Sequence, residues 1–113
     1  MRAVNKSSGT VLAGRVVVAK TPFSRMKGLL GRRSLPGGEG LLIKPCKGVH
    51  TFLMKFPIDV LFLDKNNRII EAVQDLQPYR MTKVWFSAVS AIEVPAGTVL
   101  ASKSVIGDEI ILK

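Results

Sequence analysis

Residues 46–64 read CKGVHTFLMKFPIDVLFLD, and the fold prediction starts from this stretch. Its second half, Ile58 to Leu63, is strongly apolar and has the length typical of a core strand. The next residues, 64–67 (DKNN), predict a tight hairpin turn, because Asn adopts the left-handed conformation that such turns need. Residues 68–73 then predict the returning strand. The stretch therefore predicts a hairpin built on one core strand.

Other β-branched and apolar segments predict further short strands. They lie within residues 3–19, with a turn at Ser8-Gly9, and at 41–43, 49–54, 91–94 and 109–112. Many short strands with few helices favour a small, mainly β domain, a β-sandwich or barrel-like fold rather than a βαβ fold. We expect a single domain over residues 1–113, a length sufficient for one hydrophobic core.

One short amphipathic helix is predicted over about residues 21–31. Thr21 is a suitable N-cap and Pro22 a suitable first helical residue. The apolar face of this helix would consist of Phe23, Met26, Leu29 and Leu30. Residues 97–104 could form a second helical turn.

Composition limits the function classes. The chain has a single Cys, so it cannot form an intramolecular disulfide, and no apolar run approaches the roughly 18 residues of a membrane span. The first residues lack the apolar segment of a signal peptide, which makes a cytoplasmic location the default expectation. The sequence indicates no particular cofactor or oligomeric state.

Charge is distributed unevenly along the chain. The net charge is +9, and no acidic residue precedes Glu39, whereas basic residues recur from Arg2 to Arg33. A basic half is compatible with binding to nucleic acid or to an acidic protein. The alternative is a solvated surface that keeps a small protein soluble. No aromatic residues interleave with the basic ones in the manner of base-stacking sites.

Cys46, His50 and Met54 recur every four residues and would share one face of a strand or a helix. Thiolate, imidazole and thioether are soft ligands that suit copper(I) better than zinc. On a straight strand, however, Cys46 and Met54 would lie about 26 Å apart. Cys46 and His50 could also form a nucleophile pair, with Lys44 and Lys47 lowering the thiol pKa. The alternative to both is ordinary core packing.

Two carboxylates occur in apolar surroundings, Asp59 in PIDVLFL and Glu93 in AIEVP. Burial of a carboxylate is costly unless the group is paired or hydrogen-bonded. For Asp59 we expect either an arginine of the helix, Arg25 or Arg32, or backbone N–H groups of a nearby loop. Each carboxylate could be structural or could contact a ligand.

Four segments follow one another between residues 21 and 113: FSRMKGLLGRRSLP, PCKGVHTFLMKFPIDVLFLD, AIEVPAGTV and VIGDEI. With these segments in this order, the chain resembles the bacterial and archaeal family called "domain of unknown function 192". It implies a small, sandwich-like β domain with a short helix, and it implies no established activity. The polar or soft residues that match the family pattern are Arg25, Arg32, His50, Met54, Asp59 and Glu93.

The first functional hypothesis is a pocket between the helix and the sheet that binds a small ligand, with or without catalysis. Arginine there would favour an anionic group, and His50 could donate a hydrogen bond or carry a proton. The alternatives are a basic interaction module for nucleic acid or an acidic protein, and a copper-type site at Cys46, His50 and Met54.

Overall fold

In the computed structural model, strand β5 (Ile58–Leu63) belongs to the core, and all six of its residues are buried. The structure describes the backbone of residues 1–113 and every side chain except those of Pro22, Phe23 and Met26. β5 pairs antiparallel with β6 (Ile69–Leu76) through the predicted hairpin and with β7 (Ser90–Pro95) on its other side. The turn is as predicted: Asn67 has a φ of 58°.

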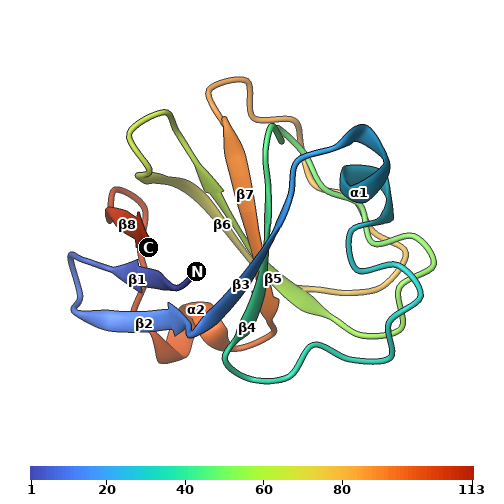
Figure 1. Ribbon diagram of the computed structural model, residues 1–113, viewed down its shortest axis with the longest axis horizontal. Helices are drawn as coiled ribbons and strands as arrows, with labels where there is room; N and C mark the ends of the chain where they lie inside the picture. The colour runs from blue at the N-terminus through green and yellow to red at the C-terminus, as the bar shows by residue number, and fades with distance from the viewer.

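The five-stranded sheet has the order β3-β4-β7-β5-β6 (Figure 1). β3 (Arg15–Ala19) and β4 (Glu39–Ile43) run parallel, and helix α1 (Pro22–Lys27) lies in the connection between them. The sequence did not predict this β-α-β connection. Whether β4 runs parallel or antiparallel to β3 depends on the path of residues 28–38, which connect α1 to β4. The predicted mainly β, sandwich-like architecture is otherwise confirmed.

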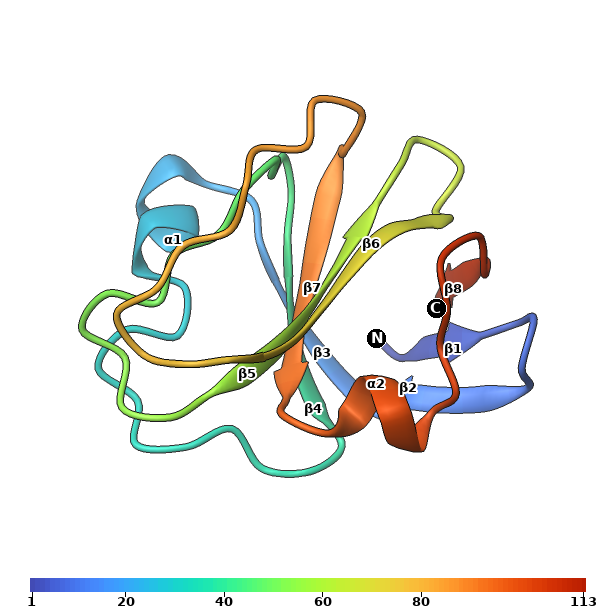
Figure 2. The same ribbon diagram turned by 180° about the vertical axis from the view of Figure 1, so that it is seen from behind.

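A second, three-stranded sheet covers one face of the larger one. It contains β1 (Ala3–Asn5), β2 (Thr10–Ala13) and β8 (Ile110–Leu112), in the order β2-β1-β8. Helix α2 (Thr98–Ala101) lies at this side and confirms the predicted second helical turn. Figure 2 shows this layer and α1 on opposite sides of the five-stranded sheet. The two faces of the sheet consequently pack into two separate apolar clusters.

Helix α1 is shorter than predicted. Thr21 is the N-cap, in a capping box with Ser24, as its sequence position indicates. The helix ends at Lys27 because Gly28 takes a φ of 47°, which lies outside the helical region. Leu29 is buried in the core just beyond the helix end. The predicted places of Phe23 and Met26 on the apolar face fall outside the described side chains.

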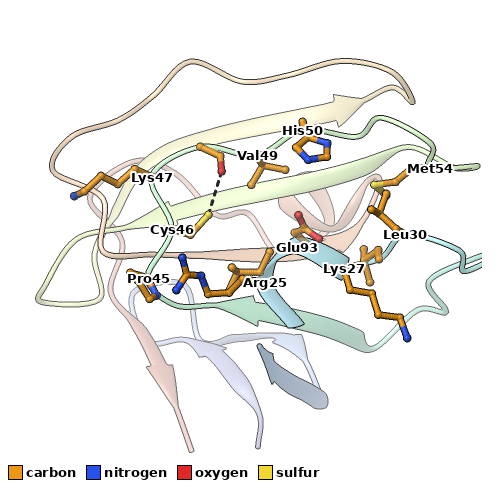
Figure 3. Close-up of a pocket in the computed structure, with 14 residues that line it drawn as sticks. Arg25, Lys27, Leu30, Pro45, Cys46, Lys47, Val49, His50, Met54 and Glu93 are labelled. Carbon is orange, nitrogen blue, oxygen red and sulfur yellow. Dashed lines mark hydrogen bonds between the residues drawn. The ribbon is translucent and has the colours of Figure 1, made fainter. Parts of the chain in front are cut away.

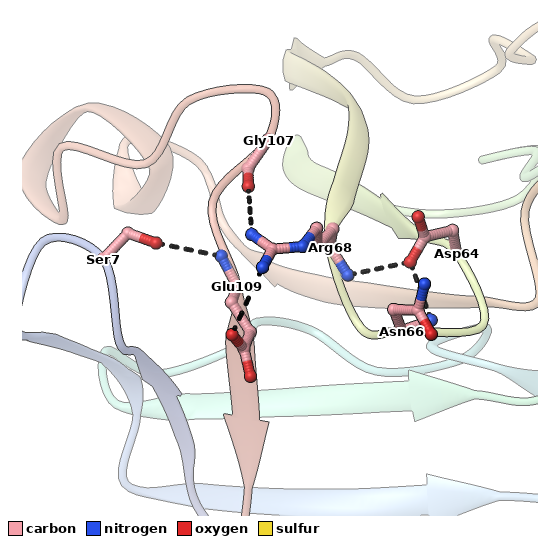
Figure 4. A network of polar contacts seen from close by, with 6 residues as sticks. All are labelled: Ser7, Asp64, Asn66, Arg68, Gly107 and Glu109. Atoms are coloured by element: carbon pink, nitrogen blue, oxygen red, sulfur yellow. Dashed lines mark hydrogen bonds and ion pairs between the residues drawn. The ribbon is translucent and has the colours of Figure 1, made fainter.

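A polar network joins the β5–β6 turn to the start of β8 (Figure 4). The Arg68 guanidinium donates a hydrogen bond to the carbonyl of Gly107 (3.0 Å) and lies 3.6 Å from the Glu109 carboxylate. On the other side, Asp64 Oδ1 accepts from the backbone N–H groups of Asn66 and Arg68. These contacts fix the second sheet against the hairpin. Neither helix of the described chain is long and apolar enough to cross a membrane.

Candidate functional site

A cavity of about 410 Å³ opens between α1, the loop that follows β4, and the five-stranded sheet (Figure 3). Segments distant in the sequence contribute to it: the helix and its exit, residues 43 and 45–50, Met54 and the middle of β7. Its walls combine apolar side chains with cationic ones and a single carboxylate. The lining residues are Arg25, Lys27, Gly28, Leu29, Leu30, Ile43, Pro45, Cys46, Lys47, Gly48, Val49, His50, Met54 and Glu93.

Glu93 supplies the carboxylate of the cavity. In the sheet it pairs with Leu41 of β4 and Val60 of β5, and its side chain therefore points to the face that α1 covers. Glu93 is only 3% exposed, and its Oε1 has no hydrogen-bond partner among the described residues. Burial raises the pKa of this carboxyl from 4.5 to about 7. Glu93 can therefore gain or lose a proton near neutral pH.

Cys46 lines the cavity next to Gly48. Its Sγ donates a hydrogen bond to the Gly48 carbonyl at 3.2 Å. Burial raises the pKa of the thiol; Glu93 contributes to the rise, whereas Gly48 and Arg25 partly oppose it. A raised pKa favours the neutral thiol, which is a poor nucleophile. His50 uses its Nδ1 to accept from the Phe52 N–H, so the described contacts include none that would activate the thiol.

Met54 reaches the cavity because the chain bends. The sequence predicts an extended segment over residues 49–54. In the structure only an isolated bridge between His50 and Met81 is of this kind, and the chain then turns at Phe52-Leu53. Leu53 has a φ of 66°, and the Met54 N–H closes the turn on the Thr51 carbonyl. The bend brings Cys46, His50 and Met54 to one cavity. The described residues contain no group of three or more His, Cys, Asp and Glu side chains that could hold a metal ion.

Cations line the cavity on the helix side and the loop side. Arg25 is half-buried, and in Figure 3 its guanidinium points toward Pro45 and Cys46, away from Glu93. The ion pairs among the described residues are Arg32–Glu39 and Arg68–Glu109, so neither engages Arg25. Lys47 is exposed, but its ammonium group already donates to the carbonyls of Phe86 and Ala88. Arg25 is thus a half-buried cation of the cavity that takes part in no ion pair among the described residues.

Two residues expected at the site lie elsewhere. Arg32 is exposed beyond α1, 3.8 Å from Glu39. Asp59 pairs with Val94 in the sheet and so points to the face opposite Glu93. Asp59 is fully buried, and its carboxylate accepts from the N–H groups of Asp75, Gly97 and Val99 at 2.8, 3.1 and 2.9 Å. Of the two kinds of partner expected for Asp59, backbone N–H groups are the ones found.

Arg25, His50, Met54 and Glu93 are the expected residues that the fold brings to the cavity. Sequence reasoning did not find Lys27, Leu30 and most of the wall from Ile43 to Val49. One signal was available for this wall: residues 44–57 contain no acidic side chain although they carry three lysines and the only histidine. The apolar residues of this wall gave no signal, because the same residue types fill any core.

Comparisons with known proteins agree on a family without an assigned activity. The chain is 32% identical to a "UPF0127 protein" of Thermococcus sibiricus over 112 residues, which cover 95% of this chain and 71% of that protein. It is also 32% identical to a "UPF0127 protein" of Pyrococcus horikoshii, with 95% of both chains covered.

Two solved structures share the fold at 21% identity. A protein of unknown function from Novosphingobium aromaticivorans superposes with a TM-score of 0.87, covering 99% of this chain and 84% of the other. A protein described as a putative transcription regulator, from Sinorhizobium meliloti, superposes with a TM-score of 0.79, covering 97% of this chain and 89% of the other. The model of the family DUF192, described as "Uncharacterized ACR", matches residues 3–112, and the chain belongs to this family.

Proposed function

We propose that the protein binds a small organic molecule in the cavity between α1 and the five-stranded sheet. One observation carries the proposal: Glu93 lines this cavity, is almost completely buried, and leaves Oε1 without a hydrogen bond among the described residues. An unsatisfied buried polar group costs about 1–3 kcal/mol. A bound molecule that offers a hydrogen bond to Glu93 would recover much of this free energy.

The rest of the cavity supports this proposal. Its volume lies within the range of about 300–1,000 Å³ that is usual for small-molecule sites. Apolar side chains such as Leu30, Ile43 and Val49 form the larger part of its wall, and a smaller number of polar side chains complete it. This combination is typical of sites in which apolar contact supplies affinity and a few polar groups supply orientation. Because burial raises the pKa of the Cys46 thiol and the thiol is hydrogen-bonded to Gly48, we propose binding and assign no catalytic step.

The test is an NMR screen of the ¹⁵N-labelled protein with a library of small organic fragments. We expect some fragments to shift the amide signals of Gly28 and Gly48 together, because these glycines border the cavity on its two sides. The variant Leu30→Trp, which fills the cavity, should lose these shifts. Leu100→Trp, an exposed site on α2, is the matched control and should keep them. Fragments that shift other regions, or that bind Leu30→Trp equally well, would refute the proposal.

A second candidate function is binding of an acidic protein or nucleic acid. One observation favours it: the segments that cover the α1 face of the sheet, residues 20–33, 44–57 and 77–89, contain ten basic residues and no acidic one. Such a layer attracts polyanions by counterion release, which makes binding strongly salt-dependent. Fluorescence anisotropy with a labelled single-stranded oligonucleotide would test it. Binding that is absent at low salt, or indifferent to salt, would exclude this function.

A further inference from the structure

We infer that the molecule bound in the cavity is a small organic anion that also carries a hydroxyl or ammonium group, joined by an apolar skeleton. Its acid group would pair with Arg25 and its hydroxyl or ammonium group would donate to Glu93. This inference rests on the function proposed above and specifies the chemical class of its ligand.

The Glu93 end of the cavity selects a hydrogen-bond donor. The atom there that lacks a partner in the described part of the chain is Oε1, a carboxyl oxygen, which accepts hydrogen bonds. A hydroxyl group would serve whether or not Glu93 is ionised. An ammonium group would favour the ionised form and add an ionic attraction, which is strong where water is largely excluded. A purely apolar end would leave the oxygen unsatisfied.

The Arg25 end selects an anion. Arg25 is half-buried, lines the cavity and takes part in neither ion pair found among the described residues. Guanidinium groups bind carboxylates through two parallel hydrogen bonds, so an acid group of a ligand is a matched partner. Lys27 and His50 are exposed at the same cavity and make its potential more positive. A neutral or cationic group at this end would be disfavoured.

The two ends are separate, and therefore the ligand has to bridge them. Arg25 and Glu93 have opposite charges and line one cavity, yet they do not form an ion pair. Figure 3 shows why: the guanidinium is directed toward Pro45 and Cys46, whereas the carboxyl lies on the side of Met54 and Leu30. Apart from Lys27, Lys47 and His50 the remaining wall is apolar, and a skeleton of methylene groups or a ring fits it better than a chain of hydroxyl groups.

The test compares matched six-carbon probes by NMR titration of the ¹⁵N-labelled protein. The first probe is ω-hydroxyhexanoate; hexanoate lacks its hydroxyl group and hexanol lacks its acid group. The ω-amino analogue replaces the hydroxyl group by an ammonium group. We expect the two bifunctional probes to bind at least about fivefold more tightly than hexanoate or hexanol, the effect of one hydrogen bond to a charged group or one ion pair.

Two variants show which end of the cavity recognises which group of the probe. Arg25→Gln should abolish the preference for the acid over the alcohol. An ionised Glu93 should also favour the ammonium probe over the hydroxyl probe, and Glu93→Gln should abolish this second preference. Arg33→Gln removes an exposed cation outside the cavity and should change neither preference. The amide spectrum of each variant shows whether it is folded.

The possible results separate the two proposals. Equal affinity for all four probes, tighter binding of hexanol, or preferences unchanged in both variants would overturn the ligand class. Failure of every probe would also overturn it. In each of these cases fragment binding that is lost in Leu30→Trp would leave the binding function standing, whereas absence of such fragments would refute both.

Discussion

Replacing Glu93 by Gln should make the protein more stable above neutral pH. The pKa of Glu93 is about 7 in the folded protein against 4.5 for an ordinary glutamate, so folding favours the protonated form. This contribution to stability is complete below pH 4.5 and is lost as the pH rises through about 7. At about 1.4 kcal/mol per pH unit, the loss amounts to about 3 kcal/mol at pH 8.

Gln has nearly the same shape as Glu and does not titrate. At pH 5 the two proteins should therefore have similar free energies of unfolding, whereas at pH 8 the variant should be more stable by about 2–3 kcal/mol. Urea denaturation at several pH values measures both. Comparing the two proteins cancels the titration of all other groups.

Glu109→Gln serves as the control, because Glu109 is partly exposed and forms only a surface ion pair. This control should cost less than about 1 kcal/mol. If the stability of Glu93→Gln and that of the wild type fall in parallel between pH 5 and pH 8, Glu93 is ionised at little cost. Its carboxyl oxygen would then be well solvated, and the proposed binding function would lose the observation that carries it.

Three further predictions concern other residues. Asp59→Asn should destabilise the protein by about 2–4 kcal/mol in urea denaturation, because three backbone N–H groups lose a charged acceptor; a loss below about 0.5 kcal/mol would contradict that role. Iodoacetamide should alkylate Cys46 more slowly at pH 7.4 than it alkylates a free cysteine peptide, because the pKa of the Cys46 thiol is raised. Mass spectrometry measures both rates, and faster alkylation of Cys46 would support the Cys46–His50 nucleophile pair instead. Addition of one equivalent of zinc should leave the melting temperature unchanged, and a stabilisation that His50→Ala removes would instead establish a metal site.

The sequence determined the parts of the fold that depend on neighbouring residues. The β5–β6 hairpin follows from an apolar run, a turn with Asn and a returning strand, and each signal lies within a few positions. The start of α1 follows equally directly, because Thr21 caps the helix through a side chain only three residues from its partner Ser24. The sequence also predicted two kinds of partner for the Asp59 carboxylate, an arginine or backbone N–H groups, because a buried carboxylate needs hydrogen-bond donors. The second kind is the one found.

The composition of the cavity was decided by tertiary structure. Asp59 and Glu93 look alike in the sequence, because each is an acidic residue in an apolar strand. In the sheet, however, Asp59 pairs with Val94 and Glu93 pairs with Val60, and this offset of one position places their side chains on opposite faces. The Asp59 carboxylate accepts hydrogen bonds from three N–H groups, whereas that of Glu93 lines a cavity and has an oxygen without a partner among the described residues. Likewise, Cys46 and Met54 meet at one cavity only because residues 52–53 form a turn. Strand register and the path of a loop arise from contacts between distant segments, and local residue patterns do not encode them.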